Sequence, residues 1–144
     1  MTRTRYAVDG NLLAVQIIQQ YFGDRASVAI ATDVDTVDRL PFIVVDAAQG
    51  QDIANGPAGI AWQWAVNLAI IDETVGGCAD ISDELHEFLD SIQDAWDQRG
   101  TIAGIGAINS VEVTSIPTKS ATSATPAGNM TQFDGSFNMI VRNA

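Results

Sequence analysis

The chain has 144 residues, 47% of them hydrophobic, which suits one domain with a buried core and leaves no room for a second domain. Seven Lys and Arg residues against eighteen Asp and Glu residues give a net charge of -11, which argues against direct binding of nucleic acid or of anionic membranes. One cysteine, Cys78, and one histidine, His86, exclude an internal disulfide and argue against the common zinc sites.

The first predicted element is a helix over residues 9–22, where apolar residues recur at helical spacing. Asp9 or Asn11 would cap its start, and Gly23 would end it in the left-handed conformation. Residues 24–39 break this pattern, with a short β-prone piece at residues 28–31 followed by an acidic loop.

Residues 40–45 are apolar and β-branched and predict a strand. Residues 49–59 consist of turn-forming residues and predict a hairpin loop. In residues 60–71, large apolar residues alternate with small or polar ones, so that one strand face carries Trp62 and Trp64. We expect this face to pack under the helices.

A second helix is predicted over residues 80–98, with Asp80 as its cap and Gly100 as its stop. Two final strands follow at residues 105–116 and 133–141. The segment 117–130 between them is long and poor in large apolar residues, and we interpret it as a binding arm or a mobile loop. The side of the second helix opposite its apolar stripe carries five acids: Asp83, Glu87, Asp90, Asp94 and Asp97.

The predicted element order is αββαββ. Two hairpins separated by a helix predict an α+β fold, with a mainly antiparallel four-stranded sheet and both helices packed on one face. We expect one domain over residues 1–144, with extended hairpin loops at 49–59 and 117–130.

The motifs that suggest chemistry are incomplete. His86 and the Glu that follows it resemble the start of a helical zinc-protease motif, but Asp90 stands where the second histidine is needed. Cys78 follows two glycines at a helix entrance, where a thiol pKa is sometimes lowered, and the alternative is a small buried residue in a tight turn. We predict no catalytic residue and no metal site, and we expect a protein that is not an enzyme.

Two further patterns also fall short of a site. Asp33 and Asp35 begin like a calcium loop, yet the required glycine at the sixth position and glutamate at the twelfth are missing. Gly104 and Gly106 lack the third glycine of a dinucleotide fingerprint and precede a strand instead of a helix. We therefore predict no cofactor. No segment has the apolar run of a signal peptide or a membrane span, so we expect a soluble protein made in the cytoplasm.

The acidic side of the second helix has three interpretations. It is an ordinary solvated helix face, an interface for a basic partner, or a negative wall that prevents nucleic acid from sticking. The usual role of charged helix faces favours the first of these interpretations.

Several of these elements together resemble the tail terminator proteins of long-tailed bacteriophages, the lambda-like tail terminator family. The resemblance is carried by the strand at residues 40–45, the Gly-containing hairpin, the long strand with Trp62 and Trp64, the acidic helix that leads to Trp96, and the closing strand at residues 137–142. It covers most of the chain in element order and length.

The resemblance implies a structural virion protein of the tail or neck, assembled in the host cytoplasm. Its copies would form a ring, a hexamer in this family, that caps the finished tail tube, ends tube polymerisation and offers a joint to the head connector. The implied partners are further copies of the chain, the tail tube protein and the head-tail connector protein. Phage DNA would pass through the ring without specific binding, and no membrane is involved.

Because every copy carries the same negative charge, the contacts between copies are expected to be apolar or backbone contacts. Both hairpin loops are long enough to reach a neighbouring copy. Two alternatives remain open: another phage neck protein, such as a head-tail connector or head completion protein, and a small ligand-binding domain or enzyme. The candidate contacts between subunits or to the tube are Gln51, Asp52, Asn55, Lys119, Ser120 and Thr122.

Overall fold

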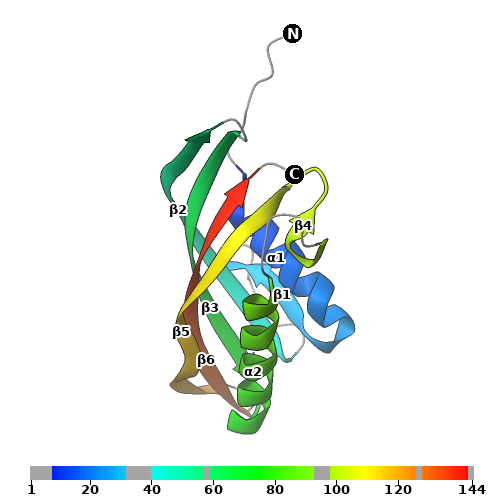
Figure 1. Ribbon diagram of the computed structural model, residues 1–144. Helices are drawn as coiled ribbons and strands as arrows, with labels where there is room; N and C mark the ends of the chain where they lie inside the picture. The colour runs from blue at the N-terminus through cyan, green and yellow to red at the C-terminus, as the bar shows by residue number, and fades with distance from the viewer. Residues whose placement is uncertain (1–7, 32–39, 57–58, 93–97, 126–127, 143–144) are drawn as a thin grey trace.

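The computed structural model describes residues 8–31, 40–56, 59–92, 98–125 and 128–142. Two helices cover one face of a curled, six-stranded sheet (Figure 1). The elements in chain order are α1 (Gly10–Phe22), the 3-10 turn η1 (Gly23–Arg25), β1 (Ser27–Ile30), β2 (Phe42–Gly56), β3 (Gly59–Asp72), α2 (Val75–Ser91), the 3-10 turn η3 (Gln98–Gly100), β4 (Thr101–Ile102), β5 (Gly106–Thr125) and β6 (Gly128–Arg142).

The sheet has the strand order β1-β2-β3-β6-β5-β4. β1 runs parallel to β2, and all other neighbouring strands are antiparallel. The prediction of a four-stranded, mainly antiparallel sheet is therefore wrong, because the sheet is mixed and has a short strand added at each edge. β1 and β4 are only four and two residues long, too short for a periodic sequence pattern. Their pairing depends on where the rest of the chain places them.

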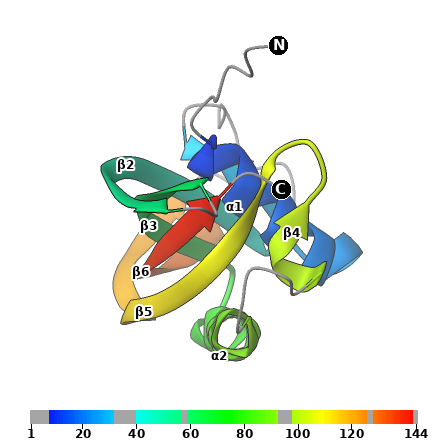
Figure 2. The same cartoon turned by 45° about the horizontal axis from the view of Figure 1, so that its top comes forward.

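The long strands form two hairpins, β2-β3 and β5-β6, which meet where β3 pairs with β6. Figure 2 shows how this sheet curls, with α1 and α2 on the same side of it. α1 packs on β1 and β2, and α2 packs on β5, β3 and β6. The buried side chains of both helices and of the inner sheet face belong to one hydrophobic core.

The alternation of large apolar and small or polar residues in β3 buries one face of the strand, as predicted. Trp62 and Trp64 are only 5% and 8% exposed and belong to the core, which confirms that this face packs under the helices. On the other face of the strand, Ala65 and Asn67 are exposed. The first residue of α1, Gly10, lies against the Trp64 indole so closely that a Cβ atom there would overlap the ring. The glycine therefore lets the helix begin directly on the tryptophan.

The α1 boundaries agree with the predicted helix. The Asp9 carboxylate accepts a hydrogen bond from the Leu12 N–H at 3.2 Å, and Gly23 follows the helix with φ +59°. Its ψ of -127° lies outside the left-handed helical conformation that was predicted, but glycine also adopts this positive-φ conformation without a steric penalty.

The second helix begins earlier and ends earlier than predicted. α2 starts at Val75, and the Thr74 hydroxyl, not Asp80, caps it by accepting a hydrogen bond from the Gly77 N–H at 3.0 Å. A Cβ atom at Gly77 would overlap the Asp72 carboxylate, so a larger residue at this position would displace that side chain. α2 ends at Ser91, and Gly100 belongs to the separate turn η3.

The two segments predicted as hairpin loops are paired strands in the structure. β2 continues to Gly56 and pairs with β3 up to Gly59, while β5 continues to Thr125 and pairs with β6 from Gly128. Residues 57–58 and 126–127, at the two turns, lie outside the described residues. Register shifts interrupt both ladders. The Ser, Thr, Ala and Gly content of these segments suggested loops, but a backbone ladder across a hairpin does not require large apolar side chains.

Candidate interaction surfaces

Two β-ribbons project from opposite ends of the sheet. We call residues 49–60 the β2-β3 ribbon and residues 119–130 the β5-β6 ribbon. β3 pairs with β6 from Ala61, opposite Arg142, to Asp72, opposite Thr131. The turn of the first ribbon lies beyond Ala61 and the turn of the second lies beyond Asp72, so the ribbons point in opposite directions (Figure 1).

The six predicted contact residues divide between these ribbons, and the structure does not bring the two groups together. Lys119 is exposed, at the base of the β5-β6 ribbon. The backbones of the other five lie in β2 and β5, and their side chains lie outside the described residues. Those five are Gln51, Asp52, Asn55, Ser120 and Thr122.

The base of the β5-β6 ribbon is fastened to α2 by two small side chains. The Ser82 hydroxyl donates a hydrogen bond to the Pro117 carbonyl at 3.1 Å, and the Cys78 thiol donates to the Thr131 carbonyl at 3.3 Å. Pro117 itself sits over Gly135, where a Cβ atom would meet its ring at 2.5 Å. Ser82 was not among the site residues predicted from the sequence. Its signal was a small polar residue on the apolar side of the helix.

At the outer edge of β2, the Asn11 side chain makes two hydrogen bonds to the backbone of Ala47. The Asn11 carboxamide donates a hydrogen bond to the Ala47 carbonyl at 2.9 Å and accepts one from the Ala47 N–H at 2.8 Å. One side chain from α1 thus satisfies both backbone groups of a strand residue, as a neighbouring strand would. Asn11 was predicted only as a possible helix cap, because a contact with residue 47 leaves no local signal in the sequence.

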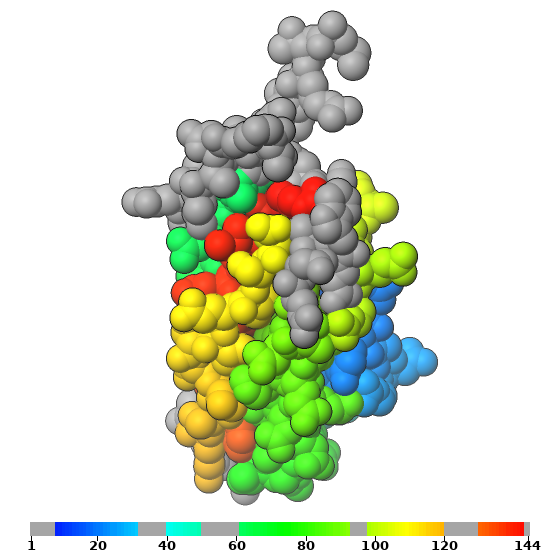
Figure 3. Space-filling view, in the orientation of Figure 1, coloured from blue at the N-terminus to red at the C-terminus, as the bar shows by residue number. Residues whose placement is uncertain are grey.

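The acidic side of α2 faces away from the sheet, and Figure 3 shows α2 at the molecular surface beside β5. Asp83, Glu87 and Asp90 are exposed, and no ion pair within the described residues involves them. The other two predicted members, Asp94 and Asp97, lie outside the described residues. The described part of this surface is a run of like charges on one helix face.

Glu84, on the same helix, is engaged with α1 and η1. Its carboxylate pairs with the Arg25 guanidinium at 2.5 Å, and it accepts a longer hydrogen bond from the Tyr21 hydroxyl at 3.4 Å. The hydrogen bond to Glu84 raises the pKa of Arg25 above its usual value. Tyr21 also stacks on Phe88 of α2, with ring centroids 4.2 Å apart. These contacts join the two helices at the surface of the core.

Cys78 and His86 do not form a nucleophile and base pair. They are eight residues apart on α2, which corresponds to about 12 Å along the helix axis. Cys78 is fully buried, and His86 is partly buried with no hydrogen-bond partner for its Nδ1 atom among the described residues. The structure thus supports the buried interpretation of Cys78, and burial raises the pKa of its thiol.

The raised pKa of Cys78 has a testable consequence. At neutral pH the thiol is expected to react with iodoacetamide at least about tenfold more slowly in the folded protein than in denaturant, because the thiolate is the reactive form and burial disfavours it. The labelled fraction is measured by mass spectrometry over time. Equal rates in folded and denatured protein would show that Cys78 is exposed and ionised.

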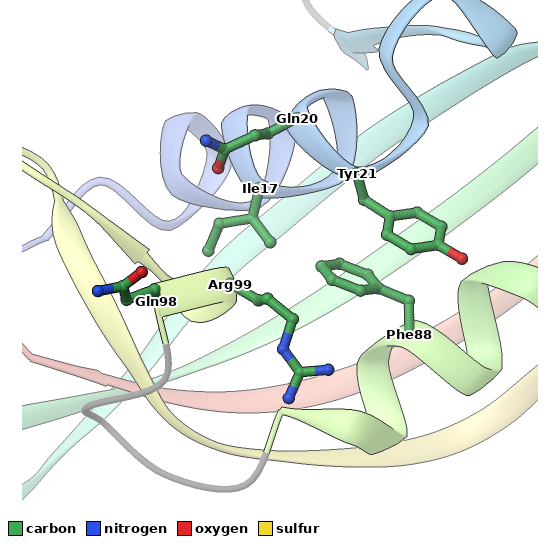
Figure 4. Close-up of a pocket in the computed structure, with 6 residues that line it drawn as sticks. All are labelled: Ile17, Gln20, Tyr21, Phe88, Gln98 and Arg99. Atoms are coloured by element: carbon green, nitrogen blue, oxygen red, sulfur yellow. The ribbon is translucent and has the colours of Figure 1, made fainter.

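A hollow of about 220 Å³ lies between α1, α2 and η3. Figure 4 shows Tyr21 and Phe88 side by side at one end of it and Gln98 at the other. The Arg99 guanidinium donates hydrogen bonds to the Ser91 hydroxyl and carbonyl, both at 2.8 Å, at the end of α2. The hollow is lined by Ile17, Gln20, Tyr21, Phe88, Gln98 and Arg99.

The described residues contain no group of three His, Cys, Asp or Glu side chains arranged to hold a metal ion. The Asp33 and Asp35 pattern falls outside the residues that the structure describes. No helix in the described part of the chain is long and apolar enough to cross a membrane.

No family model matches the sequence, and no curated protein matches it. Among solved structures, the chain is similar to one described as the virion of a native gene transfer agent particle. The TM-score is 0.49 and the sequence identity is 13%, over 95% of this chain and 98% of that chain. A likeness of this strength does not establish a function.

Proposed function

We propose that the protein is a structural virion protein of a long-tailed phage. Its copies form a ring that caps the tail tube, ends tube polymerisation and provides the joint to the head connector. In this proposal the protein has no catalytic role. The proposal starts from the resemblance to tail terminators in the strand at residues 40–45 and in the closing strand at residues 137–142.

The observation that carries the proposal is the pair of ribbons at opposite ends of the sheet. Beyond Arg142 and Asp72, each ribbon has only two strands, with no third strand beside it among the described residues. A two-stranded ribbon is marginally stable in water by itself. We therefore infer that contacts outside the subunit stabilise both ribbons. Because the two ribbons point in opposite directions, one ring could contact the tail tube with one set of ribbons and the connector with the other set.

The charge of the chain is compatible with DNA passage. Exposed acids make no attractive contacts with phosphates, so a ring that presents the acidic side of α2 to DNA would let it slide. Of the three interpretations of this helix face, we propose the negative wall. Asp83, Glu87 and Asp90 would contribute to it.

Two alternatives are kept because specific observations favour them. A head-tail connector or head completion protein would also use ribbons that reach neighbouring proteins. A small ligand-binding domain would use the hollow between α1 and α2, where the stacked rings of Tyr21 and Phe88 offer an apolar surface.

The proposed function is tested with purified protein and with phage tail parts. Light scattering measures whether the chain forms a closed ring, and electron microscopy of tail tubes grown with and without the protein measures whether tube length becomes limited. Separate pull-downs with the tail tube protein and the head connector protein of the same phage distinguish a terminator from a connector. A monomer that binds neither protein would contradict both virion roles.

Ring formation is expected to increase with salt. Each copy carries a net charge of -11, so copies repel one another, and the Debye length of about 10 Å at 0.1 M salt shortens the range of this repulsion. The ring fraction is measured by sedimentation velocity from low to moderate salt at one protein concentration. Rings that dissociate as salt increases would show that ion pairs, not backbone or apolar contacts, hold the copies together.

A further inference from the structure

The β2 edge of the sheet is covered over only part of its length. β1 pairs with residues 42–45 of β2, and the Asn11 side chain then covers Ala47. From residue 49 to residue 56, β2 pairs with β3 on one side, and no described strand pairs with its other side. We call residues 49–56 the open β2 edge. An open edge presents unpaired N–H and C=O groups to other chains.

The opposite edge of the sheet is open at its other end. β4 covers β5 only at Gly106 and Ala107, and the Ser82 hydroxyl binds the Pro117 carbonyl. From residue 118 to residue 125, β5 pairs with β6, and no described strand pairs with its outer side. We call residues 118–125 the open β5 edge. The two open edges lie diagonally across the sheet, and no described strand pairs with the outer side of β5 between residues 108 and 117 either.

Charge favours contact between unlike edges. The open β2 edge contains one charged residue, Asp52, and the open β5 edge contains one, Lys119. Pairing either edge with itself would bring two like charges together, whereas pairing one with the other brings an acid to a base. These edges also carry little of the acidic charge of the chain, so copies approach there with less repulsion than at α2.

We infer that copies of this chain join head to tail, with the open β2 edge of one copy pairing with the open β5 edge of the next. This inference rests on the proposed ring and specifies how its subunits are connected. Such a contact uses different surfaces on the two copies, and it closes into a ring when the rotation between neighbours closes. Register shifts interrupt both open edges, so regular pairing between copies is expected only over the residues between these shifts.

Cysteine pairs test the inference directly. In a Cys78→Ser background, one cysteine is placed in the open β2 edge, at Gln49 or Ala54, and one in the open β5 edge, at Thr118 or Thr122. The four combinations sample the register between the strands. Under mild oxidation at least one combination is expected to give a ladder of covalent dimers, trimers and larger species on a denaturing gel without reductant.

The control variants separate the possible contacts. Each single-cysteine variant is expected to stay monomeric on the gel, because head-to-tail pairing never brings equal positions together. A pair of cysteines at the exposed positions Gln20 and Asp83 measures chance collisions. Dimers from a single variant at Gln49 or Ala54 would show that this edge pairs with itself and would overturn the inference.

A proline substitution provides a second test that does not depend on register. The Ala47 N–H points to Asn11 and away from β3, and Gln49 has the same orientation because the first register shift comes after it. Gln49→Pro therefore removes an outward N–H and keeps the bonds to β3. It is expected to keep the fold and to lower the association constant between copies about tenfold, the effect of 1.4 kcal/mol. Ala48→Pro removes an N–H that points to β3 and serves as the contrasting variant.

The outcomes distinguish this inference from the proposed function. Rings that form normally with Gln49→Pro and give no ladder with any cysteine pair would overturn the inference and leave the proposed function intact. A ladder from a protein that neither binds nor caps tail tubes would support the inference and contradict the proposed function. A wild-type chain that stays monomeric at every concentration and gives no ladder would overturn the inference.

Discussion

Alanine in place of Trp64 is expected to lower the free energy of unfolding by about 3–5 kcal/mol, the usual cost of emptying a buried aromatic site. The indole is 8% exposed, faces Met139 across the ladder and supports the first residue of α1, Gly10. Few neighbouring side chains are free to fill the space, because the core around it is continuous. Urea denaturation followed by fluorescence and circular dichroism measures the change.

Two variants control for this result. Asn67→Ala lies on the exposed face of the same strand and is expected to change stability by less than about 0.5 kcal/mol. Gly10→Ala places a methyl group against the intact indole and is expected to cost about 1–3 kcal/mol through overpacking. A loss below 1 kcal/mol for Trp64→Ala would contradict the packing of this face.

Shortening the β5-β6 ribbon is expected to abolish assembly without unfolding the subunit. Replacing residues 123–130 by an Asn-Gly turn keeps the pair Thr122–Thr131 and the hydrogen bond from Cys78 to Thr131, and it removes only the part of the ribbon beyond the end of β3. The free energy of unfolding is expected to stay within about 1 kcal/mol of wild type. Sedimentation and electron microscopy of tail lengths measure the loss of rings and of capping.

The matched control for the shortened ribbon keeps its length. A Gly/Ser segment in place of residues 123–130 preserves the reach of the ribbon and weakens its strand pairing. If assembly needs the paired edge, both variants lose it; if length alone matters, only the shortened variant does. Rings that form and cap tubes normally with the shortened ribbon would place the contacts between copies elsewhere.

Local signals predicted several parts of this fold correctly. Helix α1 has its cap at Asp9 and its end at Gly23, and both are properties of a few neighbouring residues. The Trp62 and Trp64 face of β3 was predicted from alternation alone, because side chains on a strand point to alternate faces whatever the strand pairs with. The two hairpins were predicted for a related reason, since each joins strands adjacent in the sequence.

Long-range contacts decided what these local signals missed. The start of α2 was misplaced because Gly76 and Gly77 resemble a turn, whereas both lie in the first turn of the helix, with Gly77 beside the Asp72 carboxylate. The β-prone piece at residues 28–31 forms β1 because β2 offers it a partner, and β4, which was not predicted, pairs with β5 in the same way. The continuation of both hairpins as paired ribbons depends on cross-strand backbone bonds, to which small polar side chains contribute little.

The candidate surfaces also depend partly on the local sequence and partly on long-range contacts. Composition alone determined that this chain is acidic, and that residues 49–59 and 117–130 carry only one charged residue each, Asp52 and Lys119. Only the tertiary structure decided that the stretches are ribbons at opposite ends of one sheet, because the β3-β6 register sets their directions. It also decided where the β2 edge becomes open, since Asn11 and Ala47 meet through packing across 36 positions of sequence.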